Sequence, residues 1–458
     1  MGKYQAYPEY KDSGVEWLDK LPIHWSIPSL KMVMDVRDGT HDTPQYIEQS
    51  EDSFPLVTSK DVTSGKLLFS DCKYISKIDY LSIISRSKVD VGDILMPMIG
   101  TVGSPIVVKE RSDFAIKNLA LFKTSTNRSI NRWFLNYFLQ SNECNTQFSL
   151  EARGGVQNFV SLGTLRDLGF LQAPLDEQEK IASFLDHEAA KIDTLIDKQQ
   201  QLIQLLKEKR QAVISHAVTK GLNPNAPMRE SGVEWLGEVP EHWIVTQLKF
   251  YTLDMQTGPF GSQLHAEDYV ANEIPLINPA HMISGELIPD PNVTVDEATQ
   301  ERLSRHKLSA GDIIFARRGE LGRCAVVQEE HEGWLCGTGS LKAKLNKLLT
   351  PEYAYLLITS DGVISELSLE SKGSTMDNLN TETLGRVRIP VPPKSEQNQI
   401  LQYVEKVSGK YASLVSKAET AINLMQERRT ALISAAVTGT IDVRDWQVPA
   451  LMQNKEAV

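Results

Sequence analysis

Two long stretches of the chain carry apolar residues at alternating spacings of three and four. The first runs from Asp176 to about Val218 without proline or glycine. Such spacing predicts a helix with a single apolar seam, as in a coiled coil. The predicted seam of the first stretch is Leu185, Glu188, Ile192, Leu195, Gln199, Leu202, Leu206, Lys209 and Val213. The predicted seam of the second is Val404, Val407, Tyr411, Leu414, Ala418, Ala421, Met425, Arg428 and Leu432.

Both stretches have matching end signals. Proline precedes each start, at Pro174 and Pro393, and Gly221 and Gly439 follow each end, where a left-handed C-cap is favoured. A helix of about 40 residues rises roughly 60 Å, which is too long to bury its seam on one compact domain. We therefore expect the two helices to pack antiparallel on each other and to form a rigid spacer.

The chain repeats itself at an offset of 218 or 219 residues. The opening motif Ser13-Gly14-Val15-Glu16-Trp17-Leu18 recurs as Ser231-Gly232-Val233-Glu234-Trp235-Leu236, and Pro22, His24 and Trp25 recur as Pro240, His242 and Trp243. Later matches pair Gly92-Asp93-Ile94 with Gly311-Asp312-Ile313, Glu177-Gln178 with Glu396-Gln397, and Ala217-Val218-Thr219 with Ala436-Val437-Thr438. A register held over this length indicates an internal duplication.

Each half follows the same order of opening motif, mixed region and long helix. The mixed regions contain short β-type runs such as Ile313-Ile314-Phe315, punctuated by Gly and Pro. We predict an α+β fold with two pseudo-twofold-related mixed α/β domains, separated by two long antiparallel coiled-coil-like helices. The expected segments are 1–175 with opening motif 13–25, helical region 176–222, 223–392 with opening motif 231–243, helical region 393–440, and a tail at 441–458.

Charge at first argues against a nucleic-acid partner. The 458 residues include 48 Lys and Arg against 59 Asp and Glu, a formal net charge of −11. The distribution changes this interpretation, because residues 251–300 hold eight acids and no Lys or Arg. Residues 109–132 and 302–323 are both basic, so each mixed domain has a stretch that could contact phosphates.

Duplicated loops are the candidates for reading DNA bases. Glycines let the backbone approach closely, and Arg, Gln, Asn and Asp can pair with base edges. The first half offers Thr40, His41, Asp42 and Thr43, followed by Arg153, Gln157 and Asn158. The second half offers Ser262, Gln263, Arg317, Arg318 and Arg323, followed by Lys372, Ser374, Thr375 and Asn378. His41 beside Asp42 has no recurring nucleophile or second carboxylate, so no catalytic residue is assigned.

Several functional classes lack their sequence signals. There is no P-loop, no glycine fingerprint for a methyl donor and no amino-methylation signature. The four cysteines lack metal-ligand spacing, so we predict reduced thiols and no bound metal. No apolar run is long enough to span a membrane and the N-terminus does not resemble a signal peptide, so a cytoplasmic protein is expected.

The doubled opening motif, the Pro…Glu-Gln-x-x-Ile helix starts and the loops Gly-Thr-His-Asp-Thr-Pro and Gly-Pro-Phe-Gly-Ser resemble those of type I restriction–modification specificity subunits. This resemblance covers nearly the whole chain. It implies that 1–175 and 223–392 are target-recognition domains, each reading half of an asymmetric bipartite sequence in double-stranded DNA. It implies a non-catalytic subunit that docks two methylating subunits and is joined by translocating, cleaving subunits.

By the same resemblance, this chain holds no cofactor, and S-adenosylmethionine, ATP and Mg²⁺ belong to the partner subunits. Outward helix residues are candidates for docking these partners: Lys191, Lys198, Glu208, Arg210, Lys410, Lys417, Glu427 and Arg429. Two alternatives stay open, namely a duplicated scaffold that binds only proteins and a self-sufficient DNA adenine methyltransferase.

Overall fold

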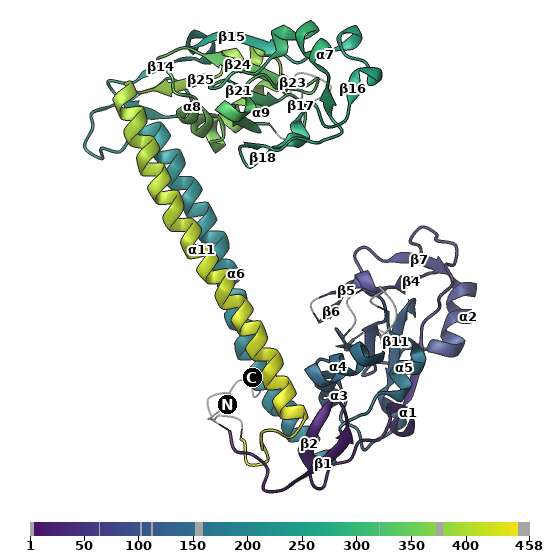
Figure 1. Cartoon of the computed structure of the whole chain (residues 1–458). Coiled ribbons are helices and arrows are strands. Elements are labelled where there is room, and N and C mark those ends of the chain that lie inside the picture. Colours follow the sequence, from purple (N-terminus) through teal and green to yellow (C-terminus); the bar gives the residue numbers. More distant parts are fainter. Residues whose placement is uncertain are drawn as a thin grey trace. The chain divides into compact units, whose positions relative to one another are not determined.

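A computed structural model describes residues 4–63, 65–100, 103–110, 113–151, 159–319, 321–371 and 379–447. The chain divides into two compact units, Met1–Gln200 with Glu419–Val458, and Gln201–Ala418. The domain boundaries drawn from the sequence stay a prediction, because these units divide each long helix between them. Figure 1 shows the elements of each unit.

The first unit is built on two small sheets. An antiparallel sheet has the order β3 (Asp35–Asp38), β11 (Leu119–Lys123), β8 (Ile94–Pro97), β9 (Ile106–Val107). A mixed sheet has the order β10 (Ala115–Ile116), β4 (Ser53–Val57), β7 (Lys73–Ser76). Two hairpins join β1 (Tyr10–Val15) to β2 (Leu18–Pro22) and β5 (Val62–Thr63) to β6 (Lys66–Leu67). The short helices are α1 (Leu30–Val33), α2 (Lys77–Ser87), α3 (Arg132–Phe138), α4 (Asn142–Glu151) and α5 (Leu162–Asp167).

The second unit repeats this plan. One sheet has the order β15 (Thr252–Thr257), β24 (Ser340–Leu345), β21 (Ile313–Ala316), β22 (Cys324–Val326). Another has the order β16 (Tyr269–Val270), β20 (Thr294–Val295), β17 (Ile274–Ile277), β23 (Leu335–Cys336). Smaller pairs are β12 (Met228–Glu230) with β13 (Glu238–Pro240), β14 (Ile244–Gln247) with β25 (Arg388–Val391), and β18 (Met282–Ile283) with β19 (Glu286–Leu287). The short helices are α7 (Glu297–Arg302), α8 (Pro351–Ile358), α9 (Asp361–Ser371) and α10 (Thr381–Arg386).

The two long helices are α6 (Leu175–Lys220) and α11 (Lys394–Val437), and they pair antiparallel within each unit (Figure 1). In the first unit Arg429 bonds Asp193 at 2.9 Å, and in the second Arg210 bonds Ser408 at 3.3 Å. Gly221 and Gly439 follow the helix ends with φ of +77° and +69°, as the C-cap signal predicts. The predicted α+β fold class is confirmed.

The seam differs from the prediction at alternate positions. Ile192, the half-buried Gln199 and Leu206 face inward as expected, but Ile196 is buried while Leu195 is 48% exposed. Leu and Ile lie next to each other at these positions, so the apolar pattern alone could not choose between them. The same shift brings Arg429 inward in place of Arg428. Arg210 and Arg429 therefore each contact the neighbouring helix, and their part in docking a partner stays a prediction.

Each opening motif is fixed to the start of a long helix by the same bonds. The Trp25 indole donates to the Glu177 carboxylate at 3.0 Å, and His24 bonds the same carboxylate at 2.7 Å. In the second unit Trp243 and His242 bond Glu396 at 3.1 and 2.8 Å.

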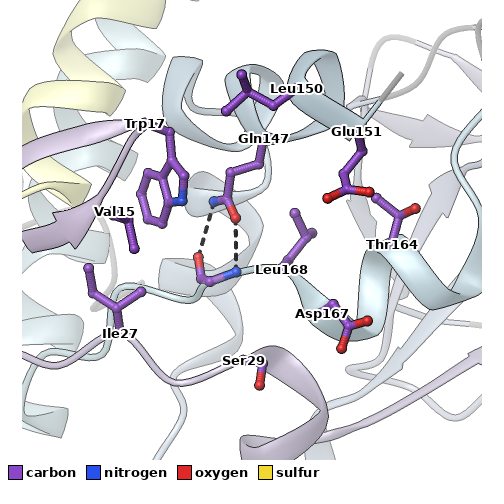
Figure 2. Close-up of a pocket in the computed structure, with 11 residues that line it drawn as sticks. Val15, Trp17, Ile27, Ser29, Gln147, Leu150, Glu151, Thr164, Asp167 and Leu168 are labelled. Atoms are coloured by element: carbon purple, nitrogen blue, oxygen red, sulfur yellow. Dashed lines mark hydrogen bonds between the residues drawn. The ribbon is translucent and has the colours of Figure 1, made fainter. Parts of the chain in front are cut away.

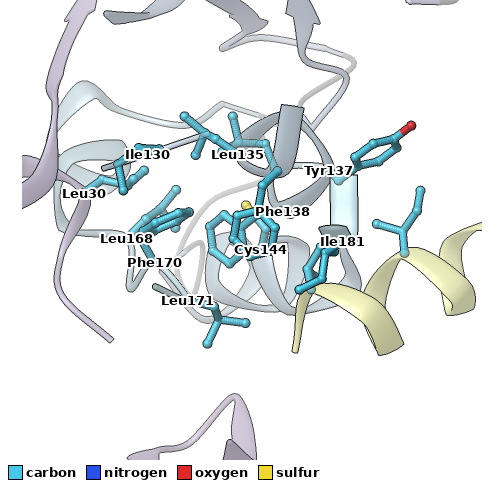
Figure 3. Packing of buried hydrophobic residues seen from close by; sticks show 14 of the residues in the cluster. Leu30, Ile130, Leu135, Tyr137, Phe138, Cys144, Leu168, Phe170, Leu171 and Ile181 are labelled. Atoms are coloured by element: carbon cyan, nitrogen blue, oxygen red, sulfur yellow. The ribbon is translucent and has the colours of Figure 1, made fainter. Parts of the chain in front are cut away.

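Each motif also packs on the end of the other long helix, at Gly439 for Trp25 and at Gly221 for Trp243. The duplicated residues are thus the joints between each domain and the helix pair. The core of the first unit is continuous across this joint, from Phe138 and Phe170 to Ile181 on α6 (Figure 3).

Candidate nucleic-acid interface

The predicted loop of the first unit lies at one end of its antiparallel sheet, and Asn118 holds it there. The backbone N–H of Asn118 donates to the Thr40 carbonyl at 3.1 Å, and its own carbonyl accepts from Met98 at the end of β8. Met98 in turn accepts from Val160, which follows the predicted loop at 153–158. Arg153, Gln157 and Asn158 themselves lie outside the described residues. The fold therefore brings the anchors of both predicted loops to one edge.

The side chains of this loop belong to a polar network. His41 bonds Asn118 at 3.0 Å and Asp38 at 2.9 Å, while Thr43 accepts a hydrogen bond from the Lys117 ammonium. The hydrogen bond with Asp38, and next that with Asn118, raises the pKa of His41 above its ordinary value. Asp42 is exposed beside it. Asn118 has a left-handed φ of +56°, a conformation that asparagine tolerates and that turns its side chain toward the loop.

A recess of about 550 Å³ opens beside this loop, and we call it the Lys117 recess. Its lining includes three lysines, two carboxylates, an aromatic ring and an apolar side chain: Lys60, Lys73, Lys117, Asp61, Asp71, Tyr46 and Leu68, with Asn118 at its edge. Lysines suit phosphate oxygens, and amides and aromatic rings suit bases. Sequence reasoning missed this recess, because its residues come from segments that share no motif.

The second unit anchors its predicted loop to the sheet in a similar way. Gly258 donates to the Ser340 carbonyl at 2.9 Å, and a Cβ there would lie 1.7 Å from the Gly337 oxygen. Only glycine lets the loop approach the sheet this closely. Ser262 and Gln263 follow in an exposed turn, Gly261–Gln263. Lys372, Ser374, Thr375 and Asn378 lie outside the described residues.

The three predicted arginines differ in whether their guanidinium groups are held by backbone carbonyls. The Arg317 guanidinium donates to the Leu379 carbonyl at 3.1 Å, and that of Arg323 donates to the Pro279 carbonyl at 3.3 Å. Arg318 is exposed between them in sequence. Arg317 and Arg323 therefore brace the loops, whereas Arg318 can reach a ligand.

The basic stretches do not form uniform phosphate-binding surfaces. Lys123 is 6% exposed and pairs with Asp93 at 2.6 Å, so it supports the sheet from within. Arg302 pairs with Asp268 at 2.6 Å and Lys307 with Glu301 at 2.6 Å. Lys123, Arg302 and Lys307 are therefore already engaged by carboxylates of the protein itself.

The two halves differ beside their opening motifs. In the first, a hollow of about 430 Å³ is lined by Trp17 and by α4 and α5, and Gln147 makes two hydrogen bonds to the Gly169 backbone (Figure 2). In the second, Arg388 takes the place of Gly169 and donates to the Gly232 carbonyl at 2.9 Å. The repeats have therefore diverged outside their joints.

The fold is a duplicated one, with two similar but non-identical domains. Residues 260–423 match the family model for the type I restriction modification DNA specificity domain. The EcoKI specificity subunit of Escherichia coli K12 is 23% identical over 442 residues, covering 93% of this chain and 91% of that protein. The putative MjaX specificity subunit of Methanocaldococcus jannaschii is 21% identical, covering 96% and 99%.

A solved structure from work on complex assembly and conformational transition of the type I R-M system has the same fold. Its TM-score is 0.63 at 17% identity, with 93% of this chain and all of that chain covered. Over nearly its whole length the chain is similar to specificity subunits of type I restriction–modification systems. These matches favour neither the scaffold nor the methyltransferase alternative. Among the described residues, no helix is long and apolar enough to cross a membrane.

Proposed function

We propose that the chain reads an asymmetric bipartite sequence in double-stranded DNA, with one half-site for each recognition domain. The observation that carries this proposal is that each domain holds a loop at the same end of its antiparallel sheet. The Gly39 and Gly258 loops each begin on an equivalent strand end, yet their contents differ. Because the two loops lie at equivalent places, we expect both to contact DNA. Because their residues differ, we expect them to read different half-sites.

The contacts in the first half-site come from the loop and the Lys117 recess. Thr40, His41, Asp42 and Thr43 face bases together with Asn118. The recess lysines Lys60, Lys73 and Lys117 bind backbone phosphates, and Arg153, Gln157 and Asn158 extend the contact from the neighbouring segment. In the second half-site the contacts are Ser262, Gln263, Arg318, Lys372, Ser374, Thr375 and Asn378, with Arg317 and Arg323 as loop braces.

Two methylating subunits and, in the full complex, translocating and cleaving subunits are the proposed protein partners. The duplication supports two copies of the methylating subunit, because two equivalent domains offer two equivalent sites. S-adenosylmethionine, ATP and Mg²⁺ are bound by these partners. The exposed pairs Leu205 with Leu424 and Leu195 with Leu414 lie at equivalent places on the long helices and support docking there.

A domain exchange tests the proposal. Residues 26–172 are replaced by those of a relative with a different target, and the reconstituted complex methylates a DNA library. We expect one half of the methylated sequence to change and the other half to stay. A change in both halves, or in neither, would contradict one half-site per domain.

A further inference from the structure

Large apolar side chains are exposed at equivalent positions of the two repeats in a few places. The pairs Leu195/Leu414 and Leu205/Leu424 lie on the long helices, and Leu68/Ile288 follows equivalent hairpins, with Leu68 lining the Lys117 recess. The remaining pair is Met32 and Phe250, which are 75% and 64% exposed. Single exposed apolar residues are ordinary, but recurrence in two diverged repeats is not explained by chance exposure.

Backbone contacts establish that Met32 and Phe250 are equivalent. Leu30 donates to the Leu168 carbonyl at 2.8 Å and is fully buried. Leu248 donates to the Val387 carbonyl at 2.9 Å and is 1% exposed. Each buried leucine therefore fixes a short turn. The residue two positions after it, Met32 or Phe250, projects an exposed apolar side chain.

The surroundings of the two side chains are also comparable. Asn127 donates from its side chain to the Val33 carbonyl at 2.9 Å, and Asn346 to the Phe250 carbonyl at 3.2 Å. A hollow of about 450 Å³ lies beside Met32. Leu348, whose N–H bonds the same Asn346 side chain, is 65% exposed near Phe250. Each turn thus offers one apolar anchor on a firmly held base.

We infer that Met32 and Phe250 are docking anchors for two copies of one protein, the methylating subunit, with one copy on each recognition domain. This inference rests on the proposed function. A partner that binds both domains must find the same feature on each, and DNA loops cannot supply it because their residues differ. The anchor enters an apolar pocket of the partner, because the flexible Met side chain can fill a pocket that also takes the Phe ring.

Asp substitutions at the two anchors test the inference. The variants Met32→Asp and Phe250→Asp are compared with Ile78→Asp and Ile244→Asp as controls. Ile78 and Ile244 are 80% and 57% exposed, and the other repeat has no large apolar residue at either place. Titration calorimetry and native mass spectrometry with the purified methylating subunit report affinity and copy number.

Each anchor variant should weaken one of the two binding events by about 30-fold or more, since a desolvated anchor is replaced by a charge. The double variant should weaken both, while the controls bind two copies like the unmodified chain. Two copies bound at unmodified affinity by both anchor variants would overturn the inference alone, as would equal weakening by the controls. Failure of the unmodified chain to bind the methylating subunit would instead overturn the proposed function.

Discussion

The buried Lys123–Asp93 pair makes a prediction with a control inside the same chain. The Lys123 ammonium lies 2.6 Å from Asp93 and 2.7 Å from Asp90, and the Asp93 side chain is 1% exposed. In the second repeat the corresponding Asp312 accepts from the Ser309 N–H at 3.0 Å, and Lys342 donates to a backbone carbonyl instead. In both halves this carboxyl accepts the N–H of the residue three positions earlier, but only in the first half does it also form a buried ion pair with a lysine.

Replacing Asp93 with Asn leaves Lys123 buried with only the half-exposed Asp90 as counter-ion. Breaking a buried ion pair in this way costs about 3–5 kcal/mol of folding stability. Because Asp90 still pairs with Lys123, we expect a loss of about 3 kcal/mol. Replacing Asp312 with Asn keeps the acceptor for Ser309 and removes a charge that burial already disfavours, since burial raises the pKa of Asp312. That change should cost less than about 1 kcal/mol.

Hydrogen exchange of the full chain separates the two halves, which a single unfolding curve does not. A loss of about 3 kcal/mol lowers the protection of β8 and β11 by about 100-fold, because about 1.4 kcal/mol is tenfold. The matched Asp312→Asn variant should leave β21 and β24 within about fivefold. Equal losses in the two variants, or protected β8 and β11 in Asp93→Asn, would refute the reasoning.

Three further predictions concern the joints, the loop and the spacer. Gln178 is fully buried and joins α6 to Asn131, Ser129 and Ala173, so Gln178→Ala should cost about 3 kcal/mol, seen as lost exchange protection at the start of α6. Because the folded pKa of His41 is raised, the protonated ring stabilises the fold fully below about pH 6.5, and this stabilisation is lost as pH rises through the raised value. The ring loses its positive charge over the same range, so DNA affinity should fall from pH 6 to pH 8. His41→Gln should flatten that profile in a binding titration. Adding a few residues to both α6 and α11 should lengthen the spacer of the methylated sequence, and altered half-sites would contradict the spacer role.

Sequence periodicity and the repeat predicted much of the architecture because they rest on strong local signals. Alternating apolar spacing, proline before and glycine after it fixed the two long helices within a few residues. The doubled Trp, His and Glu indicated the duplication, and the structure adds that they join each domain to its helix start, where Trp25 meets Glu177. The alternation failed where two similar residues adjoin, as at Leu195 and Ile196 or at Arg428 and Arg429, because burial of one or the other depends on the partner helix.

The site was predicted less completely, for a physical reason. Gly39 and Gly258 could be recognised from the sequence because close backbone approach demands glycine. The Lys117 recess could not, because tertiary packing brings its lysines together from separate segments. Charge counting also overstated the phosphate-binding surface, since Lys123 forms a buried pair and Arg302 a surface one.

The central claim is that this chain reads two unequal half-sites and directs methylation to them. Sequencing of modified adenines in a strain that carries the methylating subunit, with and without this chain, tests it most directly. We predict a single asymmetric bipartite motif, methylated in both halves across a spacer of fixed length, only when the chain is present. Methylation that persists without the chain, or a motif with two identical half-sites, would contradict the account.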